Sequence, residues 1–101
     1  MTKFEKMQAK DALRFFERYP VAKSNVVDWT KQVHDVLKRY FPKSNLSGYI
    51  AGTFFTVKKD SKGKMYVVLR HDNMTFRQQV MSAKNLIGQL RAQLEAEIGI
   101  S

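Results

Sequence analysis

The chain of 101 residues has no cysteine, which excludes disulfide bonds and thiolate metal ligands and is typical of a reducing compartment. Long apolar runs are also missing. The longest uncharged stretch, which includes residues 46–57, is too short and too polar to span a bilayer. The N-terminus is charged from its third residue and lacks the apolar segment of a signal peptide. These absences predict a soluble cytoplasmic protein that does not enter a membrane.

The residue patterns that active sites and metal centres need are equally scarce. His34 and His71 lie far apart in the sequence, and no carboxylates accompany them at the spacing of zinc ligands. There is no Gly-rich phosphate loop of the Walker or dinucleotide-binding type, and no serine stands in a nucleophile motif. We therefore predict that the protein is not an enzyme and has no catalytic residue, no metal site and no cofactor.

Acidic residues are few, and the resulting charge indicates which partners the protein can bind. The sequence has nine acidic residues and 18 lysines and arginines, which gives a formal net charge of +9. The excess is not a basic tail, because residues 1–43 hold ten basic and five acidic residues and residues 44–101 hold eight and four. Such a balance favours nucleic acid, an anionic membrane or an acidic protein surface as partner.

The two prolines divide the first half of the chain. The length predicts a single domain over residues 1–101, with an N-terminal helix in residues 1–19 and a core in residues 24–99. Apolar residues recur at helical spacing up to Pro20. They recur again from about residue 26, after the capping residues Ser24 and Asn25, until Pro42.

The middle of the chain predicts a β-hairpin. Residues 43–49 are turn-like, whereas residues 50–59 and 64–70 are rich in β-branched and aromatic residues, and Gly63 between them allows positive φ. Alternation assigns one face to the core: Phe55, Val57, Met65, Val67 and Leu69. The other face mixes aromatic and basic residues, as suits base stacking and phosphate pairing, unless a helix covers its aromatic rings: Phe54, Thr56, Lys58, Tyr66, Val68 and Arg70.

A long third helix should follow, capped by Asp72 or Asn73 and ending near Glu97. We expect it to carry the hairpin and to share one core with the preceding elements: Trp29, Val33, Leu37, Phe55, Val67, Leu69, Phe76, Val80, Ile87 and Leu90. A basic row about 20 Å long borders its apolar stripe, with no acid near it before Glu95: Arg77, Lys84 and Arg91. This row either keeps the helix soluble or extends the positively charged surface of the hairpin.

The densest positive charge lies at the predicted hairpin, in residues 58–70, which contain five basic residues and one acid. Charge concentrated on a rigid hairpin suits a polyanion, because each neutralised phosphate releases a counterion. A Lys-rich turn that is merely solvated is the alternative. The candidate nucleic-acid-binding residues are those of the hairpin and of the helix row: Lys58, Lys59, Lys62, Lys64, Arg70, Arg77, Lys84 and Arg91.

Residues 26–99 resemble the DciA family, bacterial proteins that work with the replicative helicase. The family shows a Gly turn, a strand of alternating apolar residues and a Leu-rich helix ending near Gly. A helix ending in Tyr40-Phe41-Pro42 is also similar, whereas Phe76 stands where Trp is common. The matching positions are Gly63, Met65, Val67, Leu69, Phe76, Val80, Leu86, Ile87, Leu90, Leu94 and Gly99. The resemblance implies a small KH-like α+β domain, DNA binding and contact with a DnaB-type helicase.

Charge and resemblance together predict a non-catalytic protein that binds single-stranded or duplex DNA and assists a replicative helicase. Two alternatives stay open. An RNA-binding KH-like module would prefer RNA to single-stranded DNA at matched salt. A small basic interaction or inhibitor protein, for instance one encoded by a phage, would instead bind one acidic protein tightly and no nucleic acid.

Overall fold

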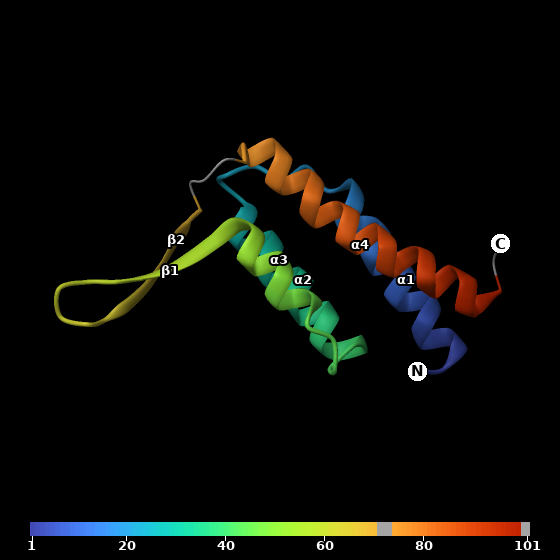
Figure 1. Ribbon diagram of the computed structural model, residues 1–101. Helices are drawn as coiled ribbons and strands as arrows, with labels where there is room; N and C mark the ends of the chain where they lie inside the picture. The colour runs from blue at the N-terminus through green and yellow to red at the C-terminus, as the bar shows by residue number, and fades with distance from the viewer. Residues whose placement is uncertain (71–73, 100–101) are drawn as a thin grey trace.

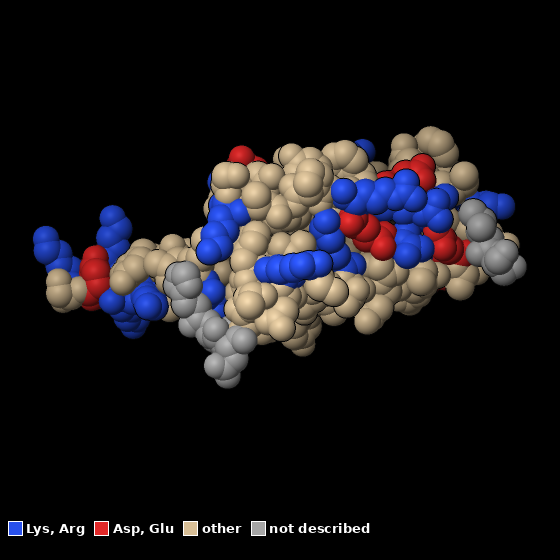
Figure 2. Space-filling view, turned by 90° about the horizontal axis from the view of Figure 1, so that it is seen from above, with Lys and Arg blue, Asp and Glu red and all other residues tan. Residues whose placement is uncertain are grey.

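The computed structural model describes residues 1–70 and 74–99 (Figure 1). Four helices and two strands follow one another: α1 (Lys3–Arg18), α2 (Val26–Tyr40), α3 (Leu46–Phe54), β1 (Phe55–Lys59), β2 (Met65–Leu69) and α4 (Phe76–Ile98). The helices form a body from whose end the hairpin projects, and the molecule extends 53 × 25 × 20 Å (Figure 1, Figure 2). The predicted α+β fold with a hairpin and a long C-terminal helix is confirmed.

Local capping explains where the first and last helices begin. Thr2 and Glu5 form a capping box at α1, in which each side chain accepts a hydrogen bond from the other residue's backbone N–H. Thr75 and Gln78 repeat this arrangement at α4. The predicted cap at Asp72 or Asn73 is therefore wrong, and those two residues lie outside the described part of the chain.

The helix α3 occupies residues that the sequence assigned to a turn and to the start of a strand. Leu46, Ile50 and Phe54 are spaced by four residues, so one face of a helix buries Ile50 and Phe54 in the core. This packing overrides the strand preference of the local composition. The strand begins only at Phe55, and Phe54 therefore does not belong to the basic and aromatic face of the hairpin.

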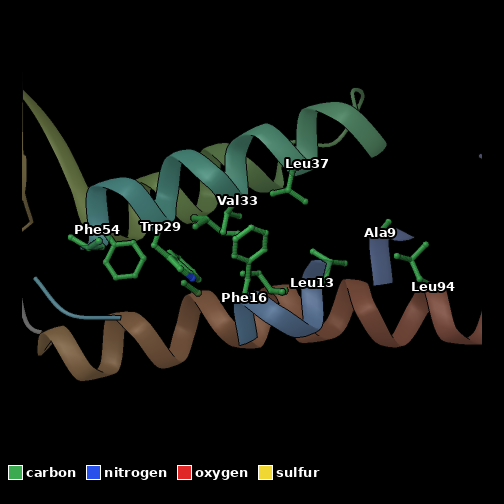
Figure 3. Packing of buried hydrophobic residues seen from close by; sticks show 12 residues of the cluster. Ala9, Leu13, Phe16, Trp29, Val33, Leu37, Phe54 and Leu94 are labelled. Atoms are coloured by element: carbon green, nitrogen blue, oxygen red, sulfur yellow. The ribbon is translucent and has the colours of Figure 1, made fainter. Parts of the chain in front are cut away.

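The core lies between an α1–α4 pair and an α2–α3 pair (Figure 3). Trp29 is its centre, with Phe16 and Phe54 packed edge-on at centroid distances of 6.3 and 5.9 Å. Four of the expected core residues are buried: Trp29, Val33, Leu37 and Ile87. Five others are half-buried against them: Phe55, Leu69, Phe76, Val80 and Leu90. Val67 is 62% exposed, so its assignment to the core is wrong.

The hairpin is antiparallel, and its register defines two faces. Phe55 pairs with Leu69, Val57 with Val67, and Lys59 with Met65 on one face; Thr56–Val68 and Lys58–Tyr66 form the other. The prediction that the hairpin packs on the last helix is wrong, because the hairpin leads away from the body (Figure 1). Only the residues at its base, Phe55 and Leu69, reach the core.

Candidate nucleic-acid interface

Asp60 organises the turn of the hairpin. Its Oδ1 accepts hydrogen bonds from the backbone N–H groups of Lys62 and Lys64, each at 2.9 Å. The backbone N–H of Asp60 donates to the carbonyl of Lys64, and Gly63 closes the turn with a φ of 79° that favours glycine. The one carboxylate of the hairpin is thus occupied by backbone donors.

Four lysines surround this turn: Lys58, Lys59, Lys62 and Lys64. All four are exposed, and none of their ammonium groups forms an ion pair with a carboxylate in residues 1–70 or 74–99. Figure 2 shows blue lysine atoms grouped around a single red acid at the projecting tip. As far as the described residues show, the positive charge of these lysines therefore faces the solvent.

Arg70 has a different position from the lysines. Its guanidinium donates to the carbonyl oxygen of Gly52 at 2.9 Å, and its backbone N–H donates to the carbonyl of Phe54 at 2.7 Å. Both acceptors lie in the last turn of α3, where carbonyl groups lack helical partners and the helix dipole favours a cation. Arg70 thus ties the base of the hairpin to α3.

The predicted row on α4 does not form a continuous free track. Arg77 is exposed in the first turn, whereas Lys84 donates to the backbone carbonyl of Tyr19 and Arg91 donates to Glu17 at 2.6 Å. Burial lowers the pKa of Lys84, and the hydrogen bond to Glu17 raises the pKa of Arg91. The expectation that no acid lies near the row before Glu95 is wrong, because α1 brings Glu17 against it.

Several charges at the end of the body remote from the hairpin form ion pairs. Arg14 and Arg91 both contact Glu95, at 2.7 and 3.2 Å, and Lys6 lies 3.5 Å from Glu97. Figure 2 shows blue and red atoms side by side over this region. These ion pairs balance part of the positive charge at that end, whereas the four hairpin lysines form no ion pair with a carboxylate in residues 1–70 or 74–99.

The Glu95 carboxylate predicts an acid dependence of stability. Partial burial alone would raise its pKa, but the hydrogen bond from Arg91 and the charge of Arg14 outweigh it and lower the pKa below its ordinary value. The ionised Glu95 carboxylate therefore stabilises the fold fully above the pKa of glutamate in the unfolded chain, about 4.3. This stabilisation is lost as the pH falls through the lower pKa of Glu95 in the folded protein. Denaturant unfolding at neutral and acid pH measures this effect. The free energy of unfolding should fall less on acidification for Glu95→Gln than for the wild type. An equal fall in both proteins would contradict the lowered pKa of Glu95.

Sequence reasoning missed a groove beside the base of the hairpin. Val27 and Lys31, one turn apart on α2, line it together with three hairpin residues, Phe55, Val67 and Leu69, around a volume of about 460 Å³. One sequence feature could have indicated this groove: Val27 is an apolar residue next to the polar side of α2, four residues before Lys31.

Residue types that bind metals are scattered over the described part of the chain. His34 is exposed on α2, and His71 lies outside the described residues. Within residues 1–70 and 74–99, no three side chains of the metal-ligating types gather together. Over the same ranges, every helix is too short or too polar to cross a membrane.

Comparison with known proteins found no matching family model, no matching curated protein and no matching solved structure. The relation to the DciA family and the KH-like form therefore remain predictions from the resemblance of residues 26–99.

Proposed function

We propose that this is a non-catalytic nucleic-acid-binding protein that holds DNA with its projecting hairpin. The observation that carries the proposal is a set of four exposed hairpin lysines that form no ion pair within residues 1–70 and 74–99: Lys58, Lys59, Lys62 and Lys64. A polyanion approaching this end meets four ammonium groups and one carboxylate that is already hydrogen-bonded to backbone. Neutralising phosphates there releases counterions, which favours binding.

The shape of the hairpin supports the same function. It stands clear of the helices, so a nucleic-acid strand can approach it from several sides (Figure 1). A two-stranded ribbon fits the major groove of duplex DNA and can equally lie along a backbone. Hydrogen bonds through Asp60 and Arg70 fix its turn and its base. An arm whose turn and base are held in this way loses less conformational entropy on binding than a free loop would.

The face that carries Lys58 and Tyr66 adds a second kind of contact. These residues are directly opposite on neighbouring strands, and the Tyr66 side chain is 45% exposed. An exposed aromatic ring can stack on a base while the neighbouring lysine pairs with a phosphate. Single-stranded DNA offers such unstacked bases, and we therefore propose it as the preferred form.

Recognition is proposed to be independent of sequence. The lysines of the hairpin act as mobile point charges, whereas base reading relies on bidentate Arg, Asn or Gln contacts. Phosphate contacts position a protein without specifying bases. The helicase contact implied by the resemblance is a separate proposal, and no geometric feature described above contributes to it.

A titration of labelled single-stranded DNA, duplex DNA and RNA of equal length tests this function. At about 50 mM salt we expect saturable DNA binding that weakens steeply by about 200 mM. Unrelated DNA sequences should bind within about tenfold of one another, since phosphates carry the affinity. No binding at the lower salt would contradict the proposal and favour the protein-interaction alternative. A strong preference for RNA would replace DNA with RNA as the ligand.

A further inference from the structure

The second face of the hairpin is apolar and open to solvent. Val57 is 54% exposed, and Met65 and Val67 are each 62% exposed, although all three lie on one face by the register of the strands. Exposed apolar side chains are ordinary when they are scattered, but these three are neighbours. We call the surface formed by Val57, Met65 and Val67 the apolar face.

The apolar face continues into the groove at the base of the hairpin. Val67 belongs to both, and the groove adds the half-buried Phe55 and Leu69 and the first turn of α2 through Val27. Together the apolar face and the groove form one continuous apolar surface, which we call the strip; the hairpin forms its base and α2 borders it on one side. A two-stranded sheet is marginally stable alone, and the apolar face of a sheet is normally covered by another element.

The charges at the margins of the strip indicate what covers it. Lys31 lines the groove at one end, and Lys59 lies on the same face at the other end, opposite Met65. A second copy of this chain, with a net charge of +9, would bring lysines against lysines. An acidic partner would place carboxylates against both of them.

We propose that the apolar face and its groove bind an amphipathic helix with an apolar ridge and acidic flanks, supplied by another protein. A helix fits because the open apolar surface is a sheet face beside a helical wall, and laying a helix there completes a two-layer arrangement. The lysine–tyrosine face that we propose for DNA points the opposite way. Lys59 lies on the apolar face and is used in both proposals, whereas Lys58 and Tyr66 stay accessible to DNA when the helix is bound. This inference does not depend on the proposed DNA binding.

A synthetic peptide provides the probe: an amphipathic helix with leucines along one face and glutamates elsewhere. The test variant combines Val57→Thr, Met65→Gln and Val67→Thr, which keeps the charge and nearly the size of each side chain. The control combines Met7→Gln and Met81→Gln, two exposed methionines of the helices. Circular dichroism and unfolding curves should show that both variants remain folded, since their positions are exposed.

Fluorescence anisotropy should show saturable binding of the glutamate peptide to the wild type. We expect the triple variant to bind about tenfold or more weakly and the control within about twofold, because loss of buried apolar contacts weakens an interface. Lys31→Gln should also weaken binding of this peptide. The triple variant should bind single-stranded DNA like the wild type, which separates this inference from the proposed function.

Four results would overturn the inference. The first is that the peptide does not bind, and the second is that it binds the triple variant as tightly as the wild type. The third is that a peptide with lysines in place of glutamates binds as well as the acidic one, because an acidic partner would then have no advantage. The fourth is that sedimentation shows a dimer for the wild type and none for the triple variant, in which case a second copy covers the apolar face.

Discussion

Replacing Lys58, Lys59, Lys62 and Lys64 together by glutamine should abolish most nucleic-acid binding while the protein stays folded. These side chains are exposed, and within the described ranges they form no ion pair whose loss would destabilise the fold. Each lost phosphate contact should lower the slope of log affinity against log salt by about 0.7 on single-stranded DNA and about 0.9 on duplex. Titrations at several salt concentrations measure both the affinity and the slope.

The matched control removes the same charge from other exposed positions: Lys3, Arg18, Lys38 and Lys43, each replaced by glutamine. An N-terminal set that included Lys6 and Arg14 would be less suitable, because both residues form ion pairs with α4. We expect the control variant to bind far better than the hairpin variant. Equal losses would mean that total charge matters and the hairpin does not. A larger loss in the control would place the binding surface on the helices.

Phe54→Ala should destabilise the protein by about 3–5 kcal/mol, the usual range for removing a buried aromatic ring. Phe54 has 0% exposure and packs against Trp29 and Phe76 at centroid distances of 5.9 Å each. It also ends α3 immediately before the first strand, so the cavity would open beneath the base of the hairpin. Denaturant unfolding monitored by circular dichroism measures the change in the free energy of unfolding.

Phe4→Ala is the control for this prediction, since the Phe4 side chain is 69% exposed. Its effect should stay within about 0.5 kcal/mol, as for other surface positions. If Phe54→Ala cost as little as Phe4→Ala, residues 46–54 would not form a helix with Phe54 in the core. Phe54 would then belong to the hairpin face that carries Lys58 and Tyr66, as the alternation in the sequence suggested.

The helices that were predicted correctly have long, regular apolar stripes and clear ends. Pro20 and Pro42 follow α1 and α2, and three of the buried residues of α2 belong to one recurring pattern: Trp29, Val33 and Leu37. The short helix α3 was missed because its composition resembles that of a strand and the contacts that stabilise it are tertiary. Spacing alone did not decide between the two structures for Ile50 and Phe54, which share a face in either.

In the candidate site, too, features set by local sequence were predicted and features set by tertiary packing were missed. The lysines around Gly63 were predicted from local sequence, because a turn exposes its side chains whatever surrounds it. The hydrogen bond from Arg91 to Glu17 was not predictable from periodicity, because it depends on how α1 packs against α4. The exposure of Val57 and Val67 was missed for a related reason. Alternation shows that two residues share a face, but it does not show whether anything covers that face.

A chemical-shift titration of the isotope-labelled protein with short single-stranded DNA tests most directly whether the hairpin binds DNA. If the hairpin holds DNA, the largest amide shifts should fall on residues 58–66, at the turn and on Tyr66 beside Lys58. The amides around the paired Arg14 and Glu95, at the other end of the body, should change little. Shifts concentrated on α1 or α4, with the hairpin unchanged at saturation, would show that the hairpin is not the DNA-binding element.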